Sequence, residues 1–173
     1  MYIDILILSQ LIHGPKHGYR IKKNVAFVLG DGYKLNNNAL YPRLKKFQEI
    51  GAVEKEVELQ NGSPNRVLYN ITDIGRKLFQ ELLQQVSEDI AADQNEFHNR
   101  LAFFSLLTEE NKERILELRI KHLEKQLDFM NEMIKVVKED DYIPFSKQLY
   151  VYTKGMLMHE IKLVESLRSL ELN

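Results

Sequence analysis

A short segment in the first third of the chain carries side chains that can hydrogen-bond to base edges and to phosphates. It contains Asn36, Asn37, Asn38, Tyr41, Arg43 and Lys46. An Asn amide donates and accepts, so it can pair with N6 and N7 of adenine, whereas Arg and Lys bind phosphate oxygens. A helix cap followed by a solvated charged face would contain the same residue types, so the segment has to be interpreted together with its neighbours.

Two neighbouring segments carry similar chemistry. One contains Lys16, His17, Tyr19 and Arg20, and the other contains Ser63, Asn65 and Arg66. Basic and small polar side chains suit phosphate contacts, and a helix start adds free N–H groups. An ordinary hairpin turn explains the second segment equally well. We predict that the residues of all three segments form one nucleic-acid-binding set.

Three helices are expected to position these residues. Apolar spacing and the Gly and Pro positions place them at Ile3–Ile12, at His17–Leu29 and from within Asn36–Asn38 onward. The start of the third helix is open. If Asn38 is the N-cap, Pro42 gives up one early hydrogen bond, and if Asn36 is the N-cap, the loss falls deeper in the helix.

A two-stranded hairpin is predicted after these helices. Val53–Leu59 and Val67–Ile71 alternate apolar and polar residues, and Asn61–Asn65 between them is a dense turn signal. Three helices followed by a hairpin is the element order of a winged helix-turn-helix, whose third helix enters the major groove and whose hairpin forms the wing. Double-stranded DNA is therefore the predicted partner.

Long helices are predicted for the remainder of the chain. One starts at Thr72 and extends to about Ser105, one starts at Thr108, and the last spans roughly Phe145–Leu172. Apolar residues in the Thr108 helix alternate at spacings of four and three, which is a coiled-coil seam that packs either within the chain or across a dimer. The predicted dimer interface contains Leu116, Ile120, Leu123, Leu127, Met130, Leu163 and Leu167.

Composition and charge suggest two parts. Apolar residues make up 44% and charged residues 28%, which is ordinary for a globular protein. Residues 1–86 carry 12 Lys and Arg against 8 Asp and Glu, whereas residues 87–173 carry 12 against 17. We predict a mainly α fold, with a winged helix-turn-helix domain and its two-stranded β wing at 1–86. A long-helix, coiled-coil-like dimerisation and effector domain is predicted at 87–173.

Four segments resemble the PadR family of transcriptional regulators. Ile12–Ile21 resembles the opening H-G-Y helix start, Asn38–Phe47 the T-L-Y-P-x-L-x-x-L recognition helix, Gly51–Val53 the G-L-(V/I) strand entry, and Arg66–Arg76 the R-x-x-Y-x-(L/I)-T-x-x-G-R wing exit. The helical remainder resembles the larger branch of the family in length and helicity. The chain departs from the family at Asn36, Asn38 and Ala39, where members often have Ser, Gly and Thr.

The resemblance implies a homodimeric repressor that leaves its operator when a small effector binds, such as a phenolic or aromatic compound. An aromatic and Met group could hold such a ligand, although a helix-packing core explains the same residues. The predicted effector-binding residues are Phe103, Tyr142, Tyr152, Met156 and His159.

Other classes of protein fit the sequence less well. The chain contains no G-x-x-x-x-G-K, G-x-S-x-G or H-E-x-x-H motif and no Cys, so we expect no enzyme, no cofactor and no metal site. Its apolar run near the start, Ile5–Leu8, is too short for a membrane span, and a cytoplasmic protein is expected. The remaining alternative is a helical protein-interaction module whose winged domain no longer binds DNA.

Overall fold

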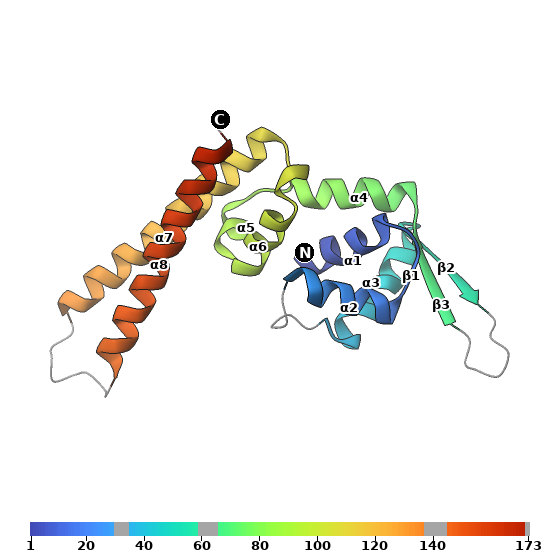
Figure 1. The fold of residues 1–173 in the computed structure, drawn as a ribbon, viewed down its shortest axis with the longest axis horizontal. Helices are drawn as coiled ribbons and strands as arrows, with labels where there is room; N and C mark the ends of the chain where they lie inside the picture. Colours follow the sequence, from blue (N-terminus) through green and yellow to red (C-terminus); the bar gives the residue numbers. More distant parts are fainter. Residues whose placement is uncertain (30–34, 59–65, 137–144, 172–173) are drawn as a thin grey trace. The chain divides into compact units, whose positions relative to one another are not determined.

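The computed structural model describes residues 1–29, 35–58, 66–136 and 145–171 (Figure 1). Its contacts divide the chain into two units, Met1–Gln85 with His98–Leu107, and Val86–Phe97 with Thr108–Asn173. The elements up to residue 85 are α1 (Tyr2–Ile12), β1 (Lys16–His17), α2 (Gly18–Leu29), α3 (Asn37–Glu49), β2 (Val53–Glu58), β3 (Arg66–Ile71) and α4 (Asp73–Gln84). The later elements are α5 (Glu88–Ala92), α6 (Gln94–Ala102), the 3-10 turn η1 (Phe104–Leu106), α7 (Glu109–Val136) and α8 (Ser146–Glu171). A domain boundary at residue 86 stays a prediction.

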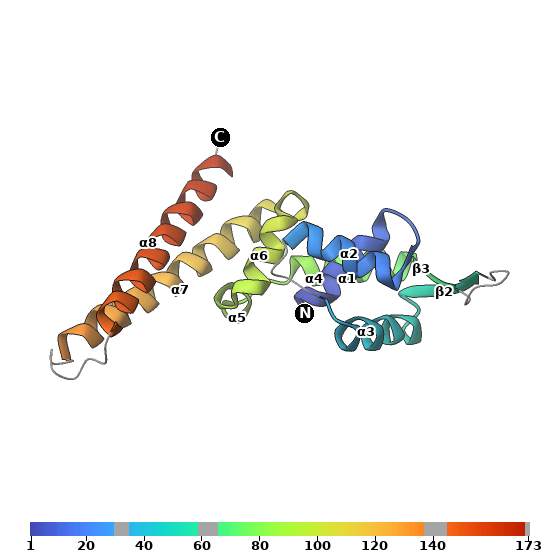
Figure 2. The same ribbon diagram turned by 60° about the horizontal axis from the view of Figure 1, so that its bottom comes forward.

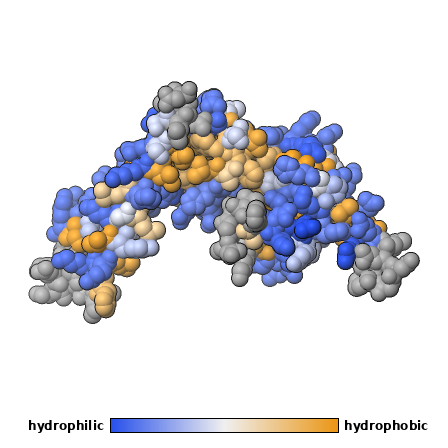
Figure 3. Space-filling model, viewed as in Figure 1, coloured by the Kyte–Doolittle hydropathy of each residue, from blue (hydrophilic) through white to orange (hydrophobic). Residues whose placement is uncertain are grey.

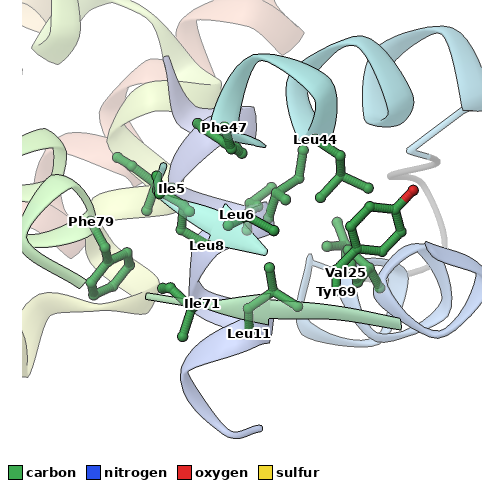
Figure 4. Close-up of a cluster of buried hydrophobic side chains, with 14 of the residues drawn as sticks. Ile5, Leu6, Leu8, Leu11, Val25, Leu44, Phe47, Tyr69, Ile71 and Phe79 are labelled. Atoms are coloured by element: carbon green, nitrogen blue, oxygen red, sulfur yellow. The ribbon is translucent and has the colours of Figure 1, made fainter. Parts of the chain in front are cut away.

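Helix α1 forms the centre of the first unit. Its residues from Ile5 to Leu11 are all buried, as expected of a helix that is apolar on nearly every side. Figure 4 shows its side chains among Phe47 of α3, Ile71 of β3 and Phe79 of α4. The core therefore holds α3 and the sheet on a shared support.

The N-cap residue defines where α3 begins. Asn36 is the N-cap, and its Oδ1 accepts a hydrogen bond from the Ala39 N–H at 2.8 Å. Pro42 consequently lies inside the helix, where its missing N–H leaves one backbone bond unmade. Leu40, Leu44 and Phe47 are buried, so the opposite face of α3 is left on the outside of the unit (Figure 2).

The predicted hairpin is confirmed, and it belongs to a three-stranded sheet. The strand order is β1-β3-β2, and both pairings are antiparallel. The two-residue strand β1 differs from the prediction, which places His17 in the second helix. The pairing of Lys16 with Tyr69 and of His17 with Leu68 fixes the start of α2 beside the wing.

The prediction of one long helix from Thr72 to about Ser105 was wrong. Thr72 is the N-cap as predicted, but α4 ends at Gln84 because Gln85 has extended backbone geometry. The buried guanidinium of Arg100 donates to the carbonyl of Gln85 at 2.9 Å and so occupies an acceptor at the end of the helix. The segment beyond residue 85 forms α5, α6 and η1 instead.

The second unit is organised by α7 and α8, which pack along each other, and α5 packs on α7. Arg119 of α7 is 3% exposed, and two of its nitrogens donate to the Glu160 carboxylate of α8 at 2.8 and 2.6 Å. The same guanidinium donates to the carbonyls of Ala91 and Ala92 at the end of α5, at 2.9 Å each. One buried charge thus connects three helices, and it lies 5.0 Å from the ring centre of Phe97.

The predicted fold class is confirmed: a mainly helical chain, with an N-terminal winged helix-turn-helix and long C-terminal helices. Within the ranges that the structure describes, no helix combines the length and apolar character that crossing a bilayer requires.

Candidate nucleic-acid interface

The three asparagines at the start of α3 have different roles. Asn36 is committed to the cap, as described above. The Oδ1 of Asn37 accepts a hydrogen bond from Lys22 Nζ of α2 at 2.6 Å. Asn38 is exposed on the first turn. Asn37 and Asn38 are therefore the amides that can reach a ligand in front of this helix.

A hollow of about 630 Å³ lies between the start of α2, the helix α3 and the strand β3. It is lined by His17, Gly18, Tyr19, Arg20, Tyr41, Arg66, Val67 and Tyr69. Two arginines and three tyrosines line this one space, and α2 begins at its edge, where the first N–H groups of a helix have no partner within the helix. This combination of donors and positive charge suits a phosphate group.

Gly18 makes this hollow possible. A Cβ atom at Gly18 would lie 3.0 Å from the hydroxyl oxygen of Tyr41 and 3.1 Å from its ring. The absence of a side chain lets the ring of Tyr41 rest directly on the start of α2. The H-G-Y segment and the Tyr-Pro pair of α3, which are separate motifs in the sequence, therefore meet at one contact.

The Tyr69 hydroxyl of the hollow is kept protonated. Burial, with a smaller contribution from Tyr41, raises the pKa of Tyr69 above its ordinary value of 10.0. A neutral phenol can donate a hydrogen bond to a phosphate oxygen, whereas a phenolate would repel it.

Two predicted DNA-binding cations point into their own domain. Arg43 forms an ion pair with Asp4 of α1 at 3.0 Å and donates to the carbonyl of Ala39. Lys16 donates to the carbonyls of Gln10 and Gly14 at the end of α1, and burial lowers its pKa. Both side chains therefore stabilise the position of α1.

The wing is held to the start of α2 through a histidine. His17 Nδ1 lies 2.9 Å from the carbonyl oxygen of Val67, and His17 Nε2 lies 3.6 Å from a carboxylate oxygen of Glu58. Its ring is thereby fixed at the edge of the hollow, and its role toward a ligand stays a prediction.

The other predicted residues of this interface divide into two groups. Tyr19, Arg20, Lys46 and Arg66 are exposed, and Tyr41 is 44% exposed. Ser63 and Asn65 lie outside the described residues. The sequence does not predict the contact of Lys22 with Asn37, fifteen positions away. It also does not predict a functional role for the acidic row on the edge strand β2, where Glu54, Glu56 and Glu58 are all exposed. Alternation of glutamates in the sequence was the available signal for that row.

The predicted dimer-interface residues have unequal exposure. Leu116 and Leu123 are buried within the chain, whereas Ile120, Leu127, Met130 and Leu167 are half-buried. Leu163 is exposed, and it continues an apolar stripe on α8 whose other members are Leu149, Tyr152 and Met156. Figure 3 shows apolar patches interrupting the hydrophilic surface over α7 and α8. The part of the seam near Leu116 thus packs inside the chain, and the outward-facing stripe is on α8.

The predicted effector residues are not gathered in one described pocket. Phe103 packs edge-to-face on Phe79, with ring centres 5.9 Å apart, as part of the first unit. Tyr152, Met156 and His159 are exposed on α8, and Tyr142 lies outside the described residues. Met156 borders a hollow between α7 and α8 that Arg119 and Glu160 also line.

The described residues contain no group of three or more His, Asp or Glu side chains arranged to hold a metal ion.

Comparison with known proteins gives one family and a set of solved structures. Residues 7–81 match the family model of the PadR-like transcriptional regulators. No curated protein matches the chain significantly. A PadR family transcriptional regulator from Eggerthella lenta is 32% identical, with 46% of this chain and 66% of that chain covered and a TM-score of 0.40.

Two other structures align along almost the whole chain. PadR of Bacillus subtilis, solved in complex with operator DNA, is 19% identical to this chain. The alignment covers 96% of each of the two chains, with a TM-score of 0.45. The protein smu.1604c from Streptococcus mutans is 24% identical, with 96% of this chain and 98% of that chain covered and a TM-score of 0.42. The assignment to a family rests on the match to the family model. Through residues 7–81, the chain belongs to the PadR-like family of transcriptional regulators.

Proposed function

We propose that the protein is a homodimeric, sequence-specific repressor that binds double-stranded operator DNA through α3 and the hollow beside it. The observation that carries this proposal is the hollow itself, where Arg20 and Arg66 share a space with tyrosine hydroxyls and the start of α2. Such a site neutralises a phosphate and fixes the register of the helix, while the amides of Asn37 and Asn38 face the bases.

The acidic row on β2 determines which side of the wing can approach the duplex. Glu54, Glu56 and Glu58 occupy every second position of the strand, so their side chains lie on one face of the sheet. Their partners on β3 are Asn70, Leu68 and Arg66, respectively. Arg66 lies on the same face as these glutamates, so the repulsion of phosphate is strongest along the outer edge of the sheet, which β2 forms. We therefore propose that the β2 side of the wing stays away from the backbone and that the side bordering the hollow contacts it.

A second copy of the chain is proposed to cover the apolar stripe of α8. Leu149 and Tyr152 are each 64% exposed, Met156 53% and Leu163 48%. Their spacing of three, four and seven places them on one helix face, which is typical of a helix that packs on another helix. A two-fold dimer would present two α3 helices to half-sites about 34 Å apart.

Release by a small phenolic or aromatic effector is the remaining part of the proposal, and it rests on the family resemblance. The feature that supports it is the hollow between α7 and α8, which joins Met156 and Leu157 to the charged pair of Arg119 and Glu160. A panel of phenolic acids tested for loss of DNA binding and for a thermal shift of the free protein would examine it. If no compound of the panel weakens DNA binding or shifts the melting temperature of the free protein, release by such an effector is excluded.

The DNA-binding part is tested by selecting duplexes from a random-sequence library with the full chain. Fluorescence anisotropy on the selected duplex would then be measured across a salt titration. We expect a steep linear fall of log K with log salt, because each neutralised phosphate contributes about −0.9 to the slope. Arg20→Ala and Arg66→Ala should each make that slope shallower by about one.

The matched control is Lys162→Ala, which removes an exposed positive charge from α8. Its slope should equal that of the parent. Selection of no duplex, or binding that does not respond to salt, would contradict the proposal and favour a protein-interaction module with an inactive winged domain.

A further inference from the structure

The contact between Lys22 and Asn37 bears on how the helix reads a base. Lys22 Nζ lies 2.6 Å from Asn37 Oδ1, and it reaches across from α2 to the first residue of α3. An ammonium group is only a donor, so the oxygen of the amide must face Lys22 and the NH₂ group must face away. The orientation of this amide is thereby fixed by a neighbouring helix.

A fixed amide has a different base preference from a free one. A free Asn suits adenine, because it donates to N7 and accepts from the N6 amino group. The Asn37 oxygen keeps a second lone pair, but a base amino group that approached it would lie beside the ammonium, with one donor facing another. The Asn37 NH₂ and the remaining Lys22 N–H groups together offer donors alone.

Guanine presents two acceptors, N7 and O6, in the major groove, and so it matches a donor-only pair. We propose that Lys22 is a positioning residue for base specificity: it holds Asn37 as a donor and directs it to guanine instead of adenine. The inference rests on the proposed DNA-binding function, since it concerns which base α3 selects.

The other polar side chains near the start of α3 are held by different contacts and do not orient Asn37. Asn36 is held by its cap bond, and Arg43 is held by Asp4. Lys22 is half-buried on α2, next to the exposed Lys23. Among the described side chains at the start of α3, the Lys22–Asn37 hydrogen bond is the one that joins a reader to a different helix.

The test starts from the duplex selected by the full-length parent. Selection with Asn37→Ala identifies the base pair that faces residue 37, as the position where the preference disappears. Affinities for duplexes that differ only in guanine or adenine at that position are then measured for the parent and for Lys22→Met. We expect the parent to prefer guanine by on the order of tenfold, the scale of a good base contact, and Lys22→Met to lose or reverse that preference.

Two controls separate specificity from charge and from folding. Lys23→Met removes the same charge one position away, so it should lower both affinities equally and keep their ratio. Lys22→Arg keeps a donor-only side chain and should restore the guanine preference if Lys22→Met loses affinity or folds poorly.

The outcomes distinguish this inference from the function on which it rests. No duplex bound by the parent overturns both. A parent that binds DNA overturns the inference alone in three cases: Asn37→Ala changes no position, adenine is preferred there, or Lys22→Met keeps the parental guanine-to-adenine ratio.

Discussion

Substitution of Gly75 by Ala should destabilise the winged domain, although Ala is the better helix former. Gly75 lies in the first turn of α4, where its N–H donates to the capping hydroxyl of Thr72. A Cβ atom there would lie 2.1 Å from the carbonyl oxygen of Ala52 and 2.7 Å from Cγ1 of Ile71. The carbonyl cannot move freely, because it also accepts the N–H of Thr72 at 3.1 Å.

The magnitude follows from three opposing contributions. Ala gains up to about 1 kcal/mol over Gly in helix propensity. Overpacking a filled site costs about 1–3 kcal/mol, and losing the bond between Thr72 and Ala52 costs about 1 kcal/mol more. The net effect of Gly75→Ala should be a loss of about 1–3 kcal/mol in the free energy of unfolding, since the clash is with backbone.

The same substitution at Gly155 is the matched control. Gly155 also lies inside a helix, α8, but a Cβ atom there would have no neighbour within 4 Å. Gly155→Ala should therefore stabilise the protein by about 0.5–1 kcal/mol. Urea unfolding of both variants, followed by circular dichroism and by amide exchange of α1, measures the difference. Equal effects of the two substitutions, or a Gly75→Ala variant as stable as the parent, would refute the steric reasoning.

Three further predictions concern the second unit. Arg119→Met leaves the Glu160 carboxylate and two carbonyls without their donor, so urea unfolding should show a loss of about 3 kcal/mol; an unchanged midpoint would contradict this. Burial, then Arg119 and Lys125, lower the pKa of His122 below 6.5 despite the opposing effect of Glu160. The folded chain therefore binds fewer protons than the unfolded chain between the lowered pKa and 6.5, and the melting temperature should fall as pH decreases through that window; His122→Gln should reduce this fall, and an identical pH profile would count against it. Met156→Asp places a charge in the exposed stripe of α8 and should halve the mass measured by light scattering, whereas a mass equal to that of the parent would exclude the stripe as the dimer contact.

The elements that the sequence predicts well are those set by local signals. The start of α3 follows from an Asn that caps it, and the hairpin follows from alternation on both sides of a Gly-Pro turn segment. Thr72 was likewise identifiable as a cap, because its hydroxyl accepts from the N–H three residues later. These features need only residues within one turn or one strand.

The features that the sequence does not reveal depend on distant partners. Arg100 binds a carbonyl fifteen positions earlier and so marks the end of α4. Arg43 has the composition of a DNA contact, yet its partner Asp4 is on another helix. Strand β1 has two residues and no periodicity, so only its pairing with β3 defines it. Local patterns carry no information about such pairs, which form when the core brings helices together.

We propose that α3 and the hollow beside it form the surface that contacts duplex DNA. Hydrogen–deuterium exchange of the full chain, with and without the selected duplex, tests this claim directly. We expect the largest DNA-dependent protection at residues 16–20, at the start of α3 and around Arg66. Protection confined to α7 and α8, or no change at the start of α3 when DNA is bound, would contradict it.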